Sequence, residues 1–176
     1  MIPLCVMGSC VSCQSVKSLR ECGICTRAVC KSCVQIVDEE HFSFLPVVAE
    51  NLRKISYCPA CFDQEVAPAM AEYDRAMERA RETIVYMKAQ SKETRLMKRK
   101  VEAVRVQDCA DYDEAILRLA FLAAQAGCNA ILDVSLTSKK VRSGSYQTTT
   151  WSGTALPSNV SERQAGDRRP ELKNPN

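Results

Sequence analysis

Apolar residues recur at alternating gaps of three and four between Met70 and Met87, which is the spacing of one helix face. The positions are Met70, Tyr73, Met77, Ala80, Ile84 and Met87. Pro68 precedes them, where the first turn of a helix tolerates proline. We therefore predict a helix within a linker of residues 65–97 that lies on the following domain. A dimerising coiled coil is the alternative use of the same pattern.

A second helix is predicted from Asp111 or Asp113, either of which can cap its start, to Ala126, with Gly127 as its C-terminal stop. This helix is apolar almost all the way round, so it must be covered on more than one side. One face suits a sheet and a second face needs another cover, either the preceding helix or a second subunit. The two faces consist of Ile116, Leu119, Ala120 and Ala123, and of Leu117, Phe121 and Ala124.

Three segments have the composition of β-strands. A Val-rich segment at residues 101–106 precedes the second helix. Residues 131–137 and 146–155 follow it and are rich in Ile, Val, Thr, Tyr and Trp, with a hairpin turn at residues 142–145. The predicted order is β-α-β-β, and the predicted fold class for the whole chain is α+β.

Composition changes along the chain divide it into four predicted parts. We expect a small cysteine-rich module at residues 1–64, the linker helix at 65–97 and an α/β domain at 98–157. Residues 158–176 are Ser-, Asn-, Arg- and Pro-rich with hardly any apolar residue, so we predict a disordered tail.

The chain has 176 residues, of which 46% are hydrophobic and 26% charged, values typical of globular proteins. No segment is long and apolar enough to span a bilayer, and the N-terminus does not have the pattern of a secretory signal. We therefore expect a cytoplasmic protein without a membrane span.

Cysteines are the compositional anomaly: there are eleven, and eight form four Cys-x-x-Cys pairs. Each such pair can deliver two thiolates to one metal ion, so four pairs predict two structural Zn²⁺ sites with four thiolates each. The pairs are Cys10/Cys13, Cys22/Cys25, Cys30/Cys33 and Cys58/Cys61. Two zinc ions on eight thiolates move the formal charge from +3 to about −1, so we expect no nucleic-acid partner.

Filled shells of four thiolates leave no open position for water or substrate, so we expect no catalytic zinc. The single histidine, His41, is predicted to be a loop or surface residue rather than a ligand. Cys109 and Cys128 are the remaining thiols of the second half, and we interpret both as packing residues. With no nucleophile and base pair in one module, we expect no enzyme.

The gaps between the pairs are 8, 4 and 24 residues, and this series resembles FYVE zinc fingers, most specifically over Cys22 to Cys33 with apolar Val29 before the third pair. The resemblance implies a treble-clef, cross-braced module in which alternate pairs share an ion. One ion would be bound by Cys10, Cys13, Cys30 and Cys33. The other would be bound by Cys22, Cys25, Cys58 and Cys61.

FYVE domains that bind phosphatidylinositol 3-phosphate carry a basic, His-rich cluster at the third ligand, whereas this chain offers only Lys17 and Arg20 beside Glu21. Lipid headgroup recognition and membrane recruitment are therefore an alternative rather than our main prediction.

RING ubiquitin ligases share the cross-brace and form a second alternative. That function requires an apolar groove at Ile24, Val34 and Ile36.

Residues 98–157 resemble the YbjQ-like domain, through the helix that ends in Gly127-Cys-Asn-Ala130 and the closing Gly153-Thr-Ala155. The resemblance implies a small α/β domain that assembles into rings, in a family with members labelled as heavy-metal binders. It favours a homo-oligomer.

Taken together, the sequence predicts a zinc-binding protein that acts as a protein-interaction or assembly module, with the partner unidentified.

Overall fold

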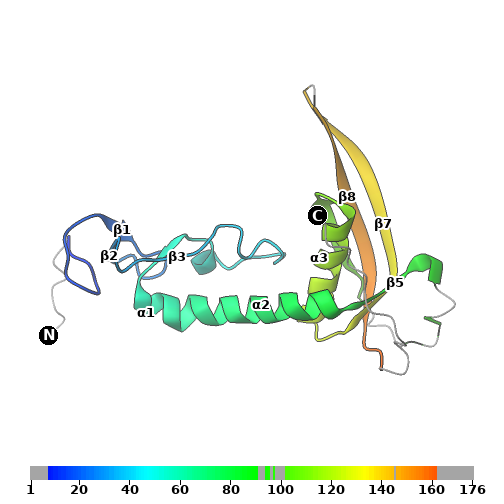
Figure 1. Ribbon diagram of the computed structural model, residues 1–176, viewed down its shortest axis with the longest axis horizontal. Coiled ribbons are helices and arrows are strands. Elements are labelled where there is room, and N and C mark those ends of the chain that lie inside the picture. Colours follow the sequence, from blue (N-terminus) through cyan, green and yellow to red (C-terminus); the bar gives the residue numbers. More distant parts are fainter. Residues whose placement is uncertain (1–7, 91–93, 96, 98–101, 145, 162–176) are drawn as a thin grey trace. The chain divides into compact units, whose positions relative to one another are not determined.

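The computed structural model describes residues 8–90, 94, 95, 97, 102–144 and 146–161. The chain divides into two compact units, Met1–Asp74 and Arg75–Asn176. The predicted α+β class is confirmed, since helices and sheets occur together (Figure 1). Among the described residues, no helix is both long and apolar enough to cross a membrane.

The first unit contains little regular structure. Two antiparallel strand pairs are present, β1 (Leu19–Glu21) with β2 (Ala28–Cys30), and β3 (Gln35–Ile36) with β4 (Ser56–Tyr57). The short helices are η1 (Glu50–Leu52), α1 (Pro59–Cys61) and η2 (Phe62–Val66). The unit ends within α2 (Ala67–Glu82). Strands of two and three residues contribute little stability by themselves, so this unit must depend on contacts outside its strands.

Helix α2 is shorter than predicted. The apolar seam was expected to remain helical to Met87, but the helix ends at Glu82 and Ile84–Met87 form strand β5. Thr83, Ile84 and Val85 are β-branched and lose side-chain freedom in a helix, whereas they pack well in a strand. The expectation for this part of the seam was therefore wrong.

The second unit is built around a four-stranded sheet with the order β5-β7-β8-β6. Its other elements are η3 (Lys88–Gln90), β6 (Val104–Cys109), α3 (Tyr112–Gln125), β7 (Ala130–Ser143) and β8 (Tyr146–Ser158). β5 pairs parallel to β7, and the other neighbours are antiparallel. The predicted β-α-β-β order is present, with β5 as an additional edge strand.

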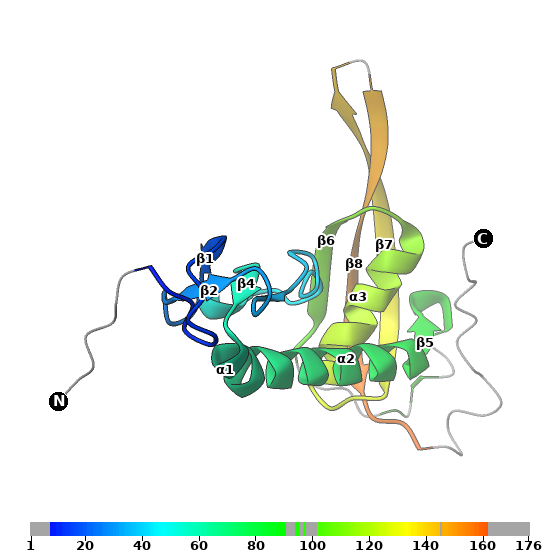
Figure 2. The same ribbon diagram turned by 60° about the vertical axis from the view of Figure 1, so that its left-hand side comes forward.

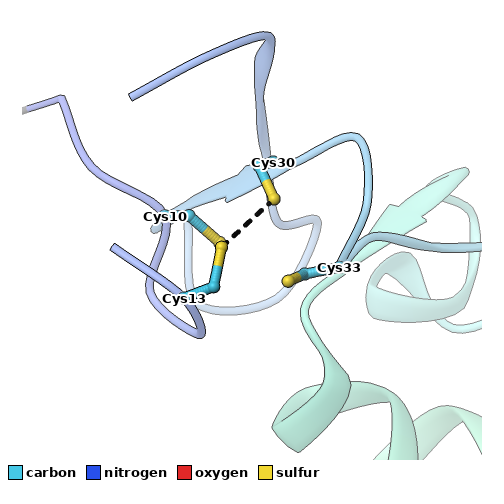
Figure 3. Close-up of side chains that lie close together, drawn as sticks. All are labelled: Cys10, Cys13, Cys30 and Cys33. Atoms are coloured by element: carbon cyan, nitrogen blue, oxygen red, sulfur yellow. Dashed lines mark hydrogen bonds between the residues drawn. The ribbon is translucent and has the colours of Figure 1, made fainter. Parts of the chain in front are cut away.

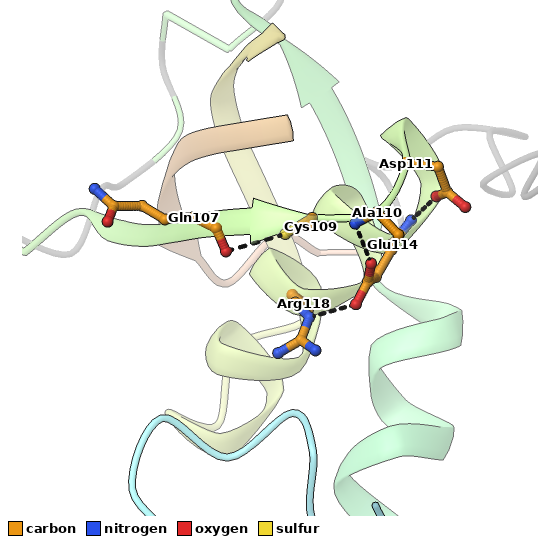
Figure 4. Close-up of polar contacts among 6 residues, drawn as sticks. All are labelled: Gln107, Cys109, Ala110, Asp111, Glu114 and Arg118. Atoms are coloured by element: carbon orange, nitrogen blue, oxygen red, sulfur yellow. Dashed lines mark hydrogen bonds and ion pairs between the residues drawn. The ribbon is translucent and has the colours of Figure 1, made fainter. Parts of the chain in front are cut away.

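Both ends of α3 are fixed as predicted. Asp111 is the N-cap, and its Oδ1 accepts a hydrogen bond from the Glu114 backbone N–H at 2.7 Å. Glu114 in turn accepts from the Ala110 N–H at 2.5 Å and from Arg118 Nε at 2.8 Å (Figure 4). These contacts satisfy backbone donors that the first turn leaves without partners.

At the C-terminal end of α3, Gly127 has a positive φ of 70°, a conformation that costs glycine little. The Gly127 N–H donates to the Ala124 carbonyl, and the Cys128 N–H donates to the Ala123 carbonyl at 2.9 Å. This pair of bonds is a Schellman motif, which ends helices at glycine. The predicted stop is confirmed.

α3 is covered within a single chain. Phe121 and Ala124, assigned to the face that needed a further cover, are 0% exposed. Arg79 of α2 donates to the Ala124 carbonyl at 3.5 Å, so the C-terminal part of α2 lies against α3 (Figure 2). The argument that a second subunit is needed to bury Phe121 therefore does not hold.

β8 approaches α3 closely at Gly153. A Cβ on Gly153 would lie 3.1 Å from the Leu119 side chain and would overlap the Leu136 side chain on β7. Glycine therefore sets the spacing between the helix and the sheet.

The sheet continues beyond the predicted domain end. β8 runs to Ser158, and Val160 is 5% exposed in a cluster with Tyr86 and Leu132. The side-chain amide of Asn129 donates to the Val160 carbonyl and accepts from its N–H, both at 2.9 Å. The polar segment from residue 158 is thus packed as far as Val160, contrary to the predicted tail. Residues 162–176 of that tail lie outside the described residues.

Candidate metal centres

The first cysteine pair of each predicted site is held by the same type of turn. The Gln14 N–H donates to the Cys10 carbonyl at 2.9 Å, and the Thr26 N–H donates to the Cys22 carbonyl at 3.0 Å. Gln14 and Thr26 both have positive φ values, 64° and 59°. Each turn reverses the chain, so that it presents two thiols on one side.

The second pair of each site begins a helical turn. The Val34 N–H donates to the Cys30 carbonyl at 3.0 Å, after β2 ends at Cys30. Cys58 is the N-cap of α1, and Pro59 occupies the first helical position. A knuckle followed by a helical turn is the arrangement of a treble clef, which the resemblance to FYVE fingers implied.

The eight thiols form two tetrads, in each of which all sulfur atoms lie within 4.8 Å of one another. Tetrad 1 consists of Cys10, Cys13, Cys30 and Cys33 (Figure 3), and tetrad 2 consists of Cys22, Cys25, Cys58 and Cys61. These are the two sets that the cross-brace implied, with the first and third pairs together and the second and fourth together.

The sulfur separations fit a tetrahedral metal site better than disulfides. Cys13 Sγ and Cys30 Sγ are 3.5 Å apart, and Cys25 Sγ and Cys58 Sγ are 3.8 Å apart. Four sulfurs at about 2.3 Å from one zinc ion lie about 3.8 Å from each other, whereas a disulfide requires about 2.05 Å. All eight cysteines are free thiols in the structure. The tetrads are therefore compatible with metal binding.

The tetrads also make up one buried cluster of the first unit. The buried cluster consists of Cys10, Cys22, Val29, Cys30, Cys58 and Cys61. Val11, Leu19, Ile24 and Val34 pack against it. A cluster made mostly of thiols gains little from apolar burial alone, so bound metal would supply much of the energy that holds this cluster together.

Hydrogen bonds to sulfur differ between the tetrads. In tetrad 1 the Ser12 N–H donates to Cys10 Sγ at 3.4 Å. In tetrad 2 the Cys58 N–H donates to Cys22 Sγ at 3.3 Å, and Arg27 Nε donates to Cys25 Sγ at 3.4 Å. The guanidinium gives tetrad 2 a positive charge beside its thiols.

The thiol pKa values show which groups ionise most readily without metal. Backbone N–H groups of Cys13 and Cys30 lower the pKa of Cys10 to about 6. Burial opposes ionisation of Cys25, yet hydrogen bonds from Arg27 bring its pKa to about 6. Hydrogen bonds with Cys13 and Cys30 raise the pKa of Cys33 to about 12. Burial, together with hydrogen bonds with neighbouring thiols, raises the pKa of Cys61 to about 12. Each tetrad thus holds at least one thiol that must lose a proton before it can bind metal.

Other candidate residues lie outside the tetrads. His41 packs against Phe42 and Tyr73, with ring centroids 4.9 and 5.3 Å away, and its Nε2 is 3.7 Å from Asp74 Oδ1. Cys109 and Cys128 are buried and belong to neither tetrad.

Two residues of the groove that the RING alternative requires, Ile24 and Val34, pack against the thiol cluster, while Ile36 is 55% exposed. Lys17 and Arg20, the basic residues named for the phosphoinositide alternative, are both exposed. Neither alternative gains support from these positions.

Arg27 is the residue of the site that sequence reasoning missed. Its position two residues after Cys25 was the available signal, because a side chain there can fold back onto the preceding sulfur.

Comparisons of the chain with protein-family models, with curated proteins and with solved structures found no match. The resemblances to FYVE fingers and YbjQ-like domains therefore stay predictions that rest on the residues quoted for them. The tetrad geometry carries the functional argument instead.

Proposed function

We propose that the protein binds two structural Zn²⁺ ions, one in each cysteine tetrad. The observation that carries this proposal is the convergence of four Cys-x-x-Cys pairs into two sets of four thiols. Four thiolates complete a tetrahedral shell, which is the arrangement of structural rather than catalytic zinc. Cys10, Cys13, Cys30 and Cys33 would hold one ion, and Cys22, Cys25, Cys58 and Cys61 would hold the other.

Elemental analysis of the purified protein tests the proposal, and we expect two zinc equivalents per chain. Removal of zinc by a chelator should unfold the first unit, because its strands are too short to be stable alone. Far-ultraviolet circular dichroism before and after chelation measures this loss. One equivalent or none, or a first unit that keeps its structure without metal, would contradict the two-site proposal.

We further propose that the zinc-stabilised unit serves as a protein-interaction module. Filled coordination shells leave the ions no substrate position, so the unit can act only through its surface. Ile36 and Ile55 provide an apolar part of that surface, with 55% and 39% exposure. The two residues stand on paired segments of the chain, since β3 pairs with β4 and the Val37 N–H donates to the Ile55 carbonyl at 3.0 Å. Exposed large apolar side chains of this kind are candidates for contact with a partner.

An Ile36→Ser/Ile55→Ser variant tests this surface in the full-length, zinc-loaded chain. We expect it to keep two zinc equivalents while losing the proteins that the unsubstituted chain retains in a pull-down. Val16→Ser is a matched control, because Val16 is also exposed, at 72%, and lies outside β3 and β4. Equal retention by both variants would contradict a role for the Ile36 and Ile55 surface.

A further inference from the structure

β7 and β8 extend well past the other strands of the sheet (Figure 1). β5 pairs with β7 only as far as Val134, and β6 pairs with β8 only from Trp151 inward. Beyond these points, in the part of the chain that the structure describes, β7 and β8 pair only with each other, up to Ser143 opposite Tyr146. We call residues 139–143 and 146–150 the distal ribbon.

The distal ribbon is positively charged. It contains Lys139, Lys140 and Arg142, all exposed. There is no Asp or Glu between Val134 and Ser158, so no carboxylate of these strands neutralises the three cations. Cations on exposed strands can prevent edge-to-edge aggregation. Such protection needs only an occasional lysine, whereas three cations within four residues make a local binding surface for polyanions.

The strand register places these cations on both faces of the ribbon. Lys139 pairs with Thr150 on one face, and Lys140 pairs with Thr149 on the other, because successive side chains alternate. Arg142 pairs with Gln147 on the same face as Lys140. A ribbon with cations on both faces can contact two rows of anionic groups at once.

Most of the other side chains of the distal ribbon are neutral hydrogen-bonding groups. They are Gln147, Thr148, Thr149 and Thr150, together with the hydroxyl of Tyr146, which is 79% exposed. Val141 is the exposed aliphatic residue, at 38%. Inserting this ribbon into a lipid bilayer would bury polar groups without partners, and a protein interface would find little apolar area. Neither occupant matches the side chains as well as a hydrated polyanion.

We propose that the distal ribbon binds double-stranded nucleic acid by lying in a groove between the two phosphate backbones. The major groove of DNA admits a two-stranded β-ribbon. The face that carries Lys140, Arg142, Gln147 and Thr149 would lie toward the base edges, and its two long cationic side chains would extend to phosphates beside the groove. Lys139 on the opposite face would contact the flanking phosphates. The net charge of the whole chain was the reason for expecting no nucleic-acid partner. That value averages over both units and conceals the local excess of positive charge on the distal ribbon. The proposal does not depend on the zinc sites.

Fluorescence anisotropy with a labelled duplex of about 20 base pairs and the full-length, zinc-loaded protein tests the proposal. We expect saturable binding that weakens steeply with salt, because phosphate contacts release counterions. A Lys139→Ala/Lys140→Ala/Arg142→Ala variant should bind about tenfold or more weaker. Its slope of log affinity against log salt should be shallower by about 2.7, at about 0.9 for each lost phosphate contact.

An Arg75→Ala/Arg81→Ala/Lys88→Ala variant is the matched control, because it removes the same charge from exposed positions of α2 and η3. It should bind the duplex nearly as well as the unsubstituted chain. Trp151, the only tryptophan, stands at the base of the ribbon, so its emission should also change on binding. Thermal melting of both variants checks that they fold.

Three outcomes would overturn the proposal. The first is no saturable duplex binding at about 50 mM salt. The second is an equal loss of affinity in the ribbon variant and the α2 control. The third is binding to vesicles that contain anionic lipid without binding to duplex, which would identify a membrane surface as the occupant.

Discussion

Arg27 donates a hydrogen bond from its Nε to the Sγ of Cys25 at 3.4 Å, which places a positive charge against tetrad 2. Four thiolates and one Zn²⁺ carry a net charge of −2, so a neighbouring guanidinium stabilises the loaded site. The Arg27→Ala variant should release one zinc ion faster than the unsubstituted chain, with an affinity loss of about tenfold at that site. A chromogenic chelator added to the loaded protein measures the release in two phases.

Arg20→Ala is the control for this prediction. Arg20 lies in β1, where it is exposed and its backbone pairs with Val29 rather than with a residue of the tetrads. Its zinc release should match that of the unsubstituted chain. Acceleration by both substitutions would mean that the general charge of the unit, rather than the Arg27 bond, controls release.

Zinc loading should weaken as pH falls. The thiol pKa of Cys33 is raised to about 12 by hydrogen bonds with Cys13 and Cys30, so this thiol is protonated at neutral pH. The pKa of Cys61 is raised to about 12 as well, first by burial and then by hydrogen bonds with neighbouring thiols. Metal binding must displace these protons, so protons compete with zinc.

Competition against a chelator of known affinity at pH 6, 7 and 8 measures this linkage, and the apparent affinity should increase at each step. Proton release on zinc addition in weak buffer provides an independent readout. An affinity that does not change with pH would mean that the thiols are ionised before the metal arrives.

Single substitutions in the two tetrads should remove one ion each. Cys13→Ser and Cys30→Ser both affect tetrad 1, and Cys61→Ser affects tetrad 2. Each variant should retain one zinc equivalent, because the other tetrad keeps four thiols. A double variant distinguishes the pairing: Cys13→Ser/Cys30→Ser should retain one equivalent, whereas Cys13→Ser/Cys61→Ser should retain none. The reverse result would contradict the observed grouping.

The N-cap of α3 should contribute measurably to the stability of the second unit. Asp111→Ala removes the acceptor for the Glu114 N–H and should lower the free energy of unfolding by about 0.5 to 2 kcal/mol. Asp113→Ala is the matched control, because Asp113 lies in the same first turn without being the cap. Thermal unfolding followed by Trp151 fluorescence compares them. Equal effects would assign the stability to helix-dipole charge alone.

The sequence predicted the ends of α3 and the four Cys-x-x-Cys pairs because each depends on local chemistry. Asp111 and Gly127 act through hydrogen bonds within a few residues, and each Cys-x-x-Cys turn is a local structure. The pairing of distant cysteines required the FYVE resemblance, since the spacing alone leaves the pairing open. The FYVE resemblance and the tetrads agree only on which cysteines lie together. Metal binding by these cysteines stays a prediction.

Features that depend on distant partners were missed. β5 was predicted as helix because Ile84 and Met87 continue the seam of α2, and only pairing with β7 makes this segment a strand. Val160 was assigned to a tail because its neighbours in sequence are polar, whereas its burial depends on Tyr86 and Leu132. No periodic pattern in the sequence marks Arg27, and its role depends on the position of the Cys25 sulfur.

The bonds from Asn129 to Val160 set a practical limit for shortening the chain. Because the side-chain amide binds both the N–H and the carbonyl of one residue, it acts as a substitute peptide group that holds the segment after β8 in place of another strand. A deletion that stops at Ser158 leaves this amide without its partner and opens the cluster around Tyr86 to water. A C-terminal fusion therefore belongs after Ser161, where the added sequence leaves this anchor intact.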